Sequence, residues 1–259
     1  MRLSGNVVII TGGNGGIGEG IAIMCAEEGA NVVIIGRNKE KNERVLSRLN
    51  IIGGGKPMAI QADLNNEEEI KGFISTVADE YGRIDTLVNN AGIFGNTKEI
   101  PQFAKPFEQI TVEEWDMIMA MNVRAAFLCC KHVAPVMKAQ KKGSIINVSS
   151  TTAWLGAPMF LHYGASKGAL LTMTKGLAIS LAPFNVRVNS LCPGQVMTDS
   201  SLSMKATREE VADQIKNKQL LQIATTPEDM GGIVVYLASD ESRIVTGQAF
   251  GVNGGGFLH

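Results

Sequence analysis

The chain has 259 residues, of which 45% are hydrophobic, and its formal net charge is −1. This length and apolar content predict a sizeable core and argue against disorder. The balanced charge gives no indication of nucleic acid or an anionic membrane as a partner, and we find no apolar run close to the roughly 20 residues that span a bilayer.

The cysteines and histidines give no indication of a metal site. Cys25, Cys129, Cys130 and Cys192 form no C-x-x-C pair, and the three histidines are scattered. The apolar run that follows Arg2 is too short for a secretory signal. We therefore expect no metal, buried free thiols and a cytoplasmic location.

Short apolar runs rich in Val and Ile alternate with longer amphipathic segments along the chain. The predicted strands are Asn6–Thr11, Asn31–Ile35, Met58–Ala62, Thr86–Asn89, Ser144–Ser149, Asn185–Leu191 and Gln248–Val252. The predicted helices include Ile17–Glu28, Glu67–Tyr81, Val112–Gln140 and Tyr163–Leu181. This alternation predicts an α/β fold, a single doubly wound Rossmann-type domain over residues 1–259 whose parallel sheet of about seven strands is flanked by helices.

Two segments interrupt the alternation. Ile93–Ile110 separates a strand from the next helix by far more residues than usual, and Gln195–Ile223 is a polar stretch with helical character. Insertions at strand ends form substrate loops in open α/β sheets, so we expect substrate loops near 93–110 and 195–223. Ordinary variable surface loops are the alternative.

A glycine-rich segment, Thr11 to Gly18, joins the first predicted strand to the first helix. Glycines permit a tight turn and let the pyrophosphate of a dinucleotide approach the main chain at a helix N-terminus. The glycine spacing also resembles that of a nucleotide-triphosphate P-loop, but Glu19 stands where the phosphate-binding lysine is required. The segment therefore predicts a dinucleotide site.

The residues after the second strand bear on which nicotinamide cofactor binds. A ribose-binding carboxylate is expected there for NAD, whereas this chain has Gly36, Arg37, Asn38 and Lys39. An arginine pairs with the 2′-phosphate of NADP. We therefore favour NADP and keep NAD, and a merely solvated basic loop, as alternatives.

Tyr163 and Lys167 lie four residues apart on a predicted helix and therefore on one face. A unit charge at about 4 Å and an effective dielectric constant of about 20 contributes roughly 4 kcal/mol, enough to lower a phenol pKa by about 3 units. Such a tyrosine transfers protons near neutral pH. Ser150, at the end of the strand before it, is placed to polarise a substrate carbonyl; Ser149 is the competing candidate, on the opposite side of the strand.

With these residues assembled, the chain resembles the short-chain dehydrogenase/reductase family nearly from end to end. Its matching motifs are T-G-x-x-x-G-x-G at Thr11–Gly18, Asp63-Leu64, N-N-A-G at Asn89–Gly92, Asn122, Ser150, Y-x-x-x-K at Tyr163–Lys167, and Pro193-Gly194 followed by Val196 and Thr198. The resemblance implies direct hydride transfer without metal between NAD(P) and a secondary alcohol or ketone. It also implies a tetramer or dimer with the helices near Val112–Gln140 and Tyr163–Leu181 at an interface.

The resemblance implies a role for each catalytic candidate. Tyr163 exchanges the proton with the substrate oxygen, and Lys167 binds the nicotinamide ribose and lowers the Tyr163 pKa. Asn122 holds a water that links Lys167 to solvent, and Ser150 orients the substrate oxygen. The residues expected to bind the cofactor are Gly12, Asn14, Gly15, Gly16, Ile17, Gly18, Arg37, Asn38, Asp63, Leu64, Asn90, Ala91, Gly92, Tyr163, Lys167, Pro193, Gly194, Val196 and Thr198.

The chain departs from the family pattern in two informative places. The basic residue that some NADP-using relatives carry in the glycine turn is absent, because Asn14 and Gly15 stand there, and the segment after Gly92 is longer than in the family's shorter members. The NADP prediction then depends on Arg37 and the missing acid.

The side chains expected near the catalytic centre are mainly apolar: Phe94, Trp154, Leu155, Phe160, His162 and Met197. They favour a hydrophobic or cyclic alcohol or ketone, such as a hydroxysteroid, unless several simply pack in the core. A 3-oxoacyl thioester on acyl-carrier protein, for which Lys141 and Lys142 are candidate contacts, and a non-catalytic nicotinamide sensor are the alternatives. An enoyl-thioester reductase is a third possibility, against which the short Tyr–Lys spacing argues. The tail Phe257-Leu258-His259 is a candidate to reach a neighbouring subunit.

Overall fold

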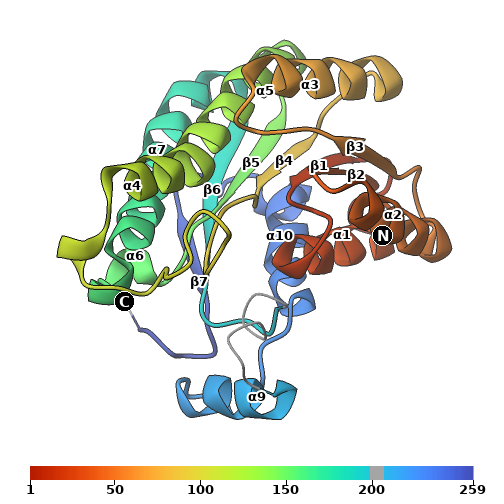
Figure 1. The fold of residues 1–259 in the computed structure, drawn as a ribbon. Coiled ribbons are helices and arrows are strands. Elements are labelled where there is room, and N and C mark those ends of the chain that lie inside the picture. Colours follow the sequence, from red (N-terminus) through yellow and green to blue (C-terminus); the bar gives the residue numbers. More distant parts are fainter. Residues whose placement is uncertain (199–206, 259) are drawn as a thin grey trace.

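The computed structural model describes residues 1–198 and 207–258 and contains a seven-stranded parallel sheet (Figure 1). The strands are β1 (Val7–Thr11), β2 (Asn31–Gly36), β3 (Met58–Gln61), β4 (Thr86–Asn89), β5 (Gly143–Val148), β6 (Val186–Pro193) and β7 (Ala249–Val252). Their order in the sheet is β3-β2-β1-β4-β5-β6-β7, and every neighbouring pair is parallel. The predicted doubly wound α/β fold is confirmed.

The described α-helices cover both faces of this sheet. They are α1 (Gly16–Glu27), α2 (Lys39–Ile52), α3 (Glu67–Tyr81), α4 (Val112–Met119), α5 (Ala125–Gln140), α6 (Thr152–Leu155), α7 (Leu161–Leu181), α9 (Arg208–Asn217) and α10 (Gly231–Ala238). Helices α3, α5 and α7 pack on one face and α1, α2 and α10 on the other (Figure 1).

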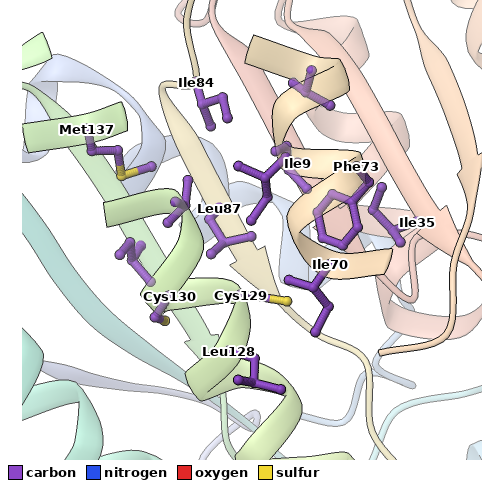
Figure 2. Packing of buried hydrophobic residues seen from close by; sticks show 14 of the residues in the cluster. Ile9, Ile35, Ile70, Phe73, Ile84, Leu87, Leu128, Cys129, Cys130 and Met137 are labelled. Atoms are coloured by element: carbon purple, nitrogen blue, oxygen red, sulfur yellow. The ribbon is translucent and has the colours of Figure 1, made fainter. Parts of the chain in front are cut away.

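Two apolar clusters fill the space between the sheet and these helical layers. In the first, Ile9 and Leu87 of the central strands pack against Phe73 of α3 and Leu128 of α5 (Figure 2). The second cluster uses the alternate residues of the same strands, such as Val8. Because helices cover both faces, all five residues of β1 are buried, which explains the unbroken apolar run in the sequence.

The predicted helix Val112–Gln140 is interrupted in the structure by a π-helical turn, Ala120–Arg124, between α4 and α5. The whole run is apolar and long enough to cross a membrane by length and composition, with a mean hydropathy of 1.2 in its most apolar window, half of which is buried. The sequence predicted this run as a helix, but we did not identify it there as long and apolar enough to cross a membrane. Leu128, Cys129 and Val133 pack it into the core of the protein.

The order of the strands places β1 beside β4. From β1 the chain continues to β2 on one side of this pair, and from β4 it continues to β5 on the other side. In open α/β sheets ligands bind beyond the carboxyl ends of the strands at such a switch point. The segment 93–110 follows β4 at this edge. Residues 199–206 of the second expected loop lie outside the described residues, and α9 lies within the remainder of that loop.

Candidate active site

The glycine turn after β1 is packed too closely for side chains at several positions. Gly12 and Gly16 have positive φ values of 64° and 52°, which favour glycine. A Cβ on Gly18 would lie 2.2 Å from the Gly12 carbonyl oxygen, and one on Gly13 would lie 2.7 Å from Ile34. These glycines therefore let the turn fold tightly between β1 and α1.

Hydrogen bonds from the neighbouring strand hold this turn in place. The Thr11 hydroxyl accepts from the main-chain N–H groups of Asn90 at 3.0 Å and Ala91 at 3.1 Å. The Asn90 amide donates to the carbonyl oxygens of Thr11 at 3.0 Å and Gly12 at 3.3 Å. The N-N-A-G motif thus fixes the glycine turn as well as bordering the site.

The start of α1 fits the pyrophosphate of a dinucleotide. Its N-cap residue, Gly15, supplies no side-chain cap, and a Cβ on Gly15 would meet nothing within 4 Å. Uncapped N–H groups at a helix N-terminus with open space beside them suit an anion. A Cβ on Gly16 would lie 3.6 Å from Thr198, so the segment after β6 lies beside this turn.

At the adenosine end, the structure separates the expected cofactor residues into two groups. Arg37 is exposed just beyond β2, and Asp63 is partly exposed with a carboxylate that accepts from the main-chain N–H of Asn65 at 3.0 Å. The Asn38 side chain instead caps α2 by accepting from the N–H of Lys41 at 2.8 Å, and the Leu64 side chain is buried in the core. The Asn38 side-chain oxygen and the Leu64 side chain are therefore engaged within the protein, and we expect the main-chain groups of these two residues to contact the cofactor.

Sequence inspection missed Asn42, a buried residue in the first turn of α2. Its side chain accepts from the Asn14 amide at 2.6 Å and donates to the carbonyl oxygens of Gly36 at 3.0 Å and Ile60 at 3.3 Å. It thereby connects the glycine turn to the ends of β2 and β3. No sequence pattern distinguishes an asparagine with this role from other asparagines on helices.

The catalytic candidates come from β5 and α7. The Ser150 side chain lies close enough to Tyr163 to lower the pKa of the phenol, whereas the Ser149 hydroxyl donates to the carbonyl oxygen of Lys167 at 2.7 Å. Ser149 is therefore engaged in holding α7 against β5, and Ser150 is the serine beside the phenol. The Lys167 ammonium lies 5.6 Å from the centre of the Tyr163 ring and donates to the Val148 carbonyl oxygen at 2.8 Å.

Asn122 lies in the π-helical turn and connects the strand end to α7. Its Oδ1 accepts from the N–H of Ile93 at 2.7 Å, while its Nδ2 donates to the Ile93 carbonyl oxygen at 3.3 Å and to the Ser166 hydroxyl at 3.1 Å. A Cβ on Gly92 would approach both Asn122 and Lys167, at 2.9 Å and 3.6 Å. π-Helical turns inside α-helices are frequent at functional sites.

The titration behaviour of the pair differs from the simple electrostatic expectation. Burial raises the pKa of Tyr163 to about 12, although the Ser150 side chain acts in the opposite direction. Burial also lowers the pKa of Lys167 to about 8. Burial disfavours the charged phenolate, a cost that the simple electrostatic expectation did not include.

The segment 93–110 brings aromatic side chains onto Tyr163. The Phe94 ring lies 4.9 Å from the Tyr163 ring and 5.7 Å from that of Phe160, between ring centres. Phe103 is buried and lies 4.7 Å from the His162 ring, together with Ile100. The segment is therefore folded against α7 by its own apolar core.

His162 is buried beside this cluster and beside an ion pair. Both ring nitrogens lack a hydrogen-bond partner, and burial lowers the pKa of the imidazole. The adjacent ion pair joins Lys105 to Glu114 at 2.6 Å and anchors the end of the segment 93–110 to α4. His162 thus lies in the wall beneath the segment, as the sequence suggested.

The remaining cofactor candidates lie at the carboxyl end of β6 and in the segment that follows it. The carbonyl oxygen of Pro193 accepts from the N–H of Thr151 at 3.0 Å, and the N–H of Gly194 donates to Val252 at 3.1 Å. The Val196 side chain is buried in the core, which leaves its main chain for the cofactor. Thr198 lies beside Gly16.

The cysteines lie away from solvent. All four are free and buried, and burial raises the pKa of Cys25 and Cys130 to about 12 and of Cys192 to about 11. Within residues 1–198 and 207–258, no three His, Cys, Asp or Glu side chains gather as a group able to hold a metal.

A hollow of about 550 Å³ lies at the opposite end of the sheet from Ser150. Its lining includes Ser144 at the start of β5, Arg187 at the start of β6, and Lys142 and Asp240. It contains none of the catalytic or cofactor candidates described above. We place the candidate active site at the carboxyl ends of the strands because the phenol, the ammonium and the glycine turn meet there.

Known proteins resemble the chain along most of its length. A family described as enoyl-(acyl carrier protein) reductase matches residues 12–256. A cyclopentanol dehydrogenase of Comamonas sp. (strain NCIMB 9872) is 37% identical, with 98% of each chain covered. A 3β-hydroxysteroid dehydrogenase of Mediterraneibacter gnavus is 32% identical over 98% of this chain and 95% of that protein.

Two further similarities extend this result. A 3-oxoacyl-[acyl-carrier-protein] reductase of Thermotoga maritima is 34% identical over 98% of this chain and 99% of that protein. The solved structure of a short-chain type dehydrogenase/reductase from Mycobacterium ulcerans has a TM-score of 0.88 and 29% identity, over 99% of this chain and 91% of that one. The chain belongs to the short-chain dehydrogenase/reductase family and is an oxidoreductase that interconverts alcohols and ketones with NAD(P).

Proposed function

We propose that this enzyme interconverts a hydrophobic or cyclic secondary alcohol, such as a hydroxysteroid, and its ketone, with Tyr163 as the proton-transfer residue and NADP as the preferred cofactor. The observation that carries the substrate class is the contact of Phe94 with Tyr163, at 4.9 Å between ring centres. An aromatic wall directly beside the phenol favours an apolar substrate.

The proposed roles follow from the positions of the side chains. The Ser150 side chain lies close enough to Tyr163 to lower its pKa, so a substrate oxygen that accepts from both hydroxyls is oriented between them. Tyr163 donates its proton to the ketone oxygen in reduction and removes it from the alcohol in oxidation. Bound nicotinamide supplies or accepts the hydride, and the positive charge of its oxidised ring opposes the rise in the Tyr163 pKa that burial causes.

Lys167 and Asn122 support this proton transfer. With a pKa of about 8, Lys167 exchanges protons near neutral pH, and its ammonium is within reach of a ribose hydroxyl beside Gly92. Two donors and one acceptor position of the Asn122 amide are occupied by Ile93 and Ser166. One acceptor position remains for the water that would connect Lys167 to solvent.

Arg37 supports the preference for NADP, because it is exposed just after β2 and no Asp or Glu is present among residues 36–39. Glu99 of the segment 93–110 interacts with it electrostatically, and we propose that the guanidinium pairs with the 2′-phosphate when NADP binds. We expect Arg37→Asp to raise the KM for NADPH by roughly tenfold or more and to leave that for NADH within about twofold. An unchanged ratio of the two would contradict the NADP preference.

Reduction of a 3-oxoacyl thioester is the second candidate, because a reductase of that kind is among the similar proteins. The lysines considered for acyl-carrier protein do not support it. Lys141 and Lys142 precede β5, whereas Ser150 follows it, so they lie roughly 20 Å apart along the strand direction. Lys142 is also paired with Asp240 at 2.8 Å.

We further propose that residues 1–259 act as one dinucleotide-binding and catalytic domain in a reducing cytoplasm, as a homotetramer or homodimer. The four buried thiols fit that compartment. Phe127 of α5 and Ile179 of α7 are 48% and 78% exposed, which fits an interface along these helices. A monomeric mass by light scattering at micromolar concentration would rule the oligomer out.

A substrate screen tests the proposed function. Steroid, cyclic and 3-oxoacyl ketones are each supplied with NADH and NADPH separately, and the absorbance at 340 nm is followed. We expect turnover with a steroid or cyclic ketone, and turnover only with the thioesters would establish the second candidate instead. Nucleotide binding without turnover on any ketone would indicate a non-catalytic sensor.

A further inference from the structure

The chain ends in a tight turn that follows β7. The Asn253 carboxamide accepts from the N–H of Gly255 at 2.9 Å and donates to the Phe257 carbonyl oxygen at 3.1 Å. Gly254 and Gly255 have positive φ values of 58° and 81°. Asn253 therefore closes the turn with its own side chain, and the glycines permit the reversal of direction.

This turn packs against the segment that follows α9. The N–H of Leu221 donates to the Gly254 carbonyl oxygen at 2.9 Å. A Cβ on Gly254 would lie 2.5 Å from the Gln219 side chain, and one on Gly255 would lie 2.9 Å from Leu220. The chain end is thus held closely by the second of the expected substrate loops.

Beyond the turn, the chain reaches the helix that follows the catalytic serine (Figure 1). The Phe257 ring stacks on the Trp154 indole of the same chain, with centres 5.8 Å apart and planes inclined by 21°. Trp154 lies in α6, within about one helical turn of Ser150. Among the ring contacts of the described residues, this pair is separate from the Phe94–Phe103–Phe160 cluster.

We propose that Asn253–Phe257 forms a strap across the substrate side of its own subunit and that Phe257, through Trp154, determines specificity for large apolar ketones. The strap connects the loop after α9 to α6, so it spans the distance between two walls expected to enclose the substrate. The stacked pair gives this side a flat apolar surface one helical turn from Ser150. This proposal rests on the proposed function, because it concerns the substrate of that site.

The stacking explains why Phe257 acts through Trp154. An indole with a single attachment to α6 has several rotamers, and a ring stacked on one face restricts them. Removal of the Phe257 ring therefore removes the stacking contact from one face of the Trp154 indole and part of the apolar wall. A large ketone that contacts the indole is affected, whereas a small ketone held only by Ser150 and Tyr163 is not.

Steady-state kinetics of Phe257→Ala with a 3-ketosteroid and with cyclopentanone test the proposal. We expect the KM for the steroid to rise roughly fivefold, with kcat, the KM for cyclopentanone and the nucleotide Kd within about twofold of the wild type. Phe257→Tyr should restore the steroid KM. Leu258→Ala is the matched control, because that neighbouring side chain is 74% exposed. Equal losses with both ketones, or no loss with either, would overturn the proposal.

A second readout does not need activity. The chain has two tryptophans, so Trp115→Phe leaves Trp154 as the single emitter. In that background we expect Phe257→Ala to increase acrylamide quenching of Trp154 fluorescence about twofold and Leu258→Ala to leave it unchanged. Unchanged quenching in Phe257→Ala would refute the strap. If no ketone is turned over but quenching increases, the proposed function fails while the strap remains in place.

Discussion

The cofactor side and the substrate side of the candidate active site are built in different ways. On the cofactor side, Thr11, Asn42 and Asn90 fix the strand ends through hydrogen bonds to main-chain groups. On the substrate side, Phe94 and Phe103 are held by aromatic and apolar packing. Main-chain hydrogen bonds require particular residue types at fixed spacings, whereas an apolar wall accepts many residue combinations of suitable volume.

This difference explains why family motifs identify the reaction but not the substrate. The similar proteins include a cyclopentanol dehydrogenase and a 3β-hydroxysteroid dehydrogenase, whose names state different substrates. Tyr163 lies where the two sides meet. Its ring contacts Phe94 of the apolar wall, and its hydroxyl lies near Ser150, just after the carboxyl end of β5. Substitutions that affect one side alone therefore test whether the two sides are independent.

The largest effect on turnover is expected for a substitution of Tyr163, where the two sides meet. Tyr163→Phe removes the hydroxyl that we propose as the proton donor and acceptor and keeps the ring that contacts Phe94. We expect kcat to fall about 10³-fold, while the nucleotide Kd stays within about twofold. Turnover at 340 nm and a nucleotide fluorescence titration measure the two quantities. Residual activity near the wild-type rate would contradict the role of Tyr163.

A pair of glycine variants tests the cofactor side. Gly18→Ala would place a Cβ 2.2 Å from the Gly12 carbonyl oxygen, so the turn must shift. We expect a loss of about 2 kcal/mol in the free energy of unfolding and a nucleotide Kd raised more than about tenfold. In Gly15→Ala the Cβ meets no protein atom within 4 Å but enters the space proposed for the pyrophosphate, so we expect an unchanged free energy of unfolding and a raised nucleotide Kd. Denaturant titrations distinguish the two variants, nucleotide titrations measure the Kd, and an equal loss of stability would contradict the packing argument.

Phe103→Ala tests the substrate side. The Phe103 side chain is 1% exposed and holds the segment 93–110 against His162 and Phe160. Loss of this buried ring should cost about 3 kcal/mol of stability, concentrated in the segment. We expect a higher KM for the ketone with an unchanged nucleotide Kd. If the nucleotide Kd rises as much as the ketone KM, the two sides are not independent.

The smallest effect concerns the cost of burying Lys167. Its pKa of about 8 lies below the 10.5 of the unfolded chain, so the unfolded chain binds the proton more readily between these values. The folded state therefore loses stability as the pH falls from 10.5 to 8, and the loss is complete below 8. Lys167→Met avoids this loss but leaves the Val148 carbonyl oxygen without its donor.

We expect Lys167→Met to raise the free energy of unfolding at pH 7 by about 1 kcal/mol while turnover falls sharply. Denaturant titrations at pH 7 and pH 9.5 check the sign, because the advantage over the wild type should shrink at the higher pH. A stability gain that is constant with pH would contradict the assignment to the buried ammonium.

The fold and the cofactor side were largely predictable because their signals are local. Helix α3 has the predicted bounds, Glu67–Tyr81, since Asn66 caps its start and Gly82 ends it. The predicted strand Thr86–Asn89 has the observed bounds, and the other predicted strands differ from the observed ones by at most two residues at an end. By contrast, the π-helical turn at Asn122 lies inside a run that reads as one continuous helix. The role of Asn42 depends on carbonyl groups from distant strands.

By itself, the sequence determined the alternation of strands and helices, the glycine turn and the pairing of Tyr163 with Lys167 on one helix. These features depend on residue types at short spacings. Only the tertiary structure decided that Ser150 rather than Ser149 faces the phenol, that burial raises the Tyr163 pKa, and that Phe257 stacks on Trp154. Desolvation and contact depend on groups brought together from the whole chain, and no local pattern records them.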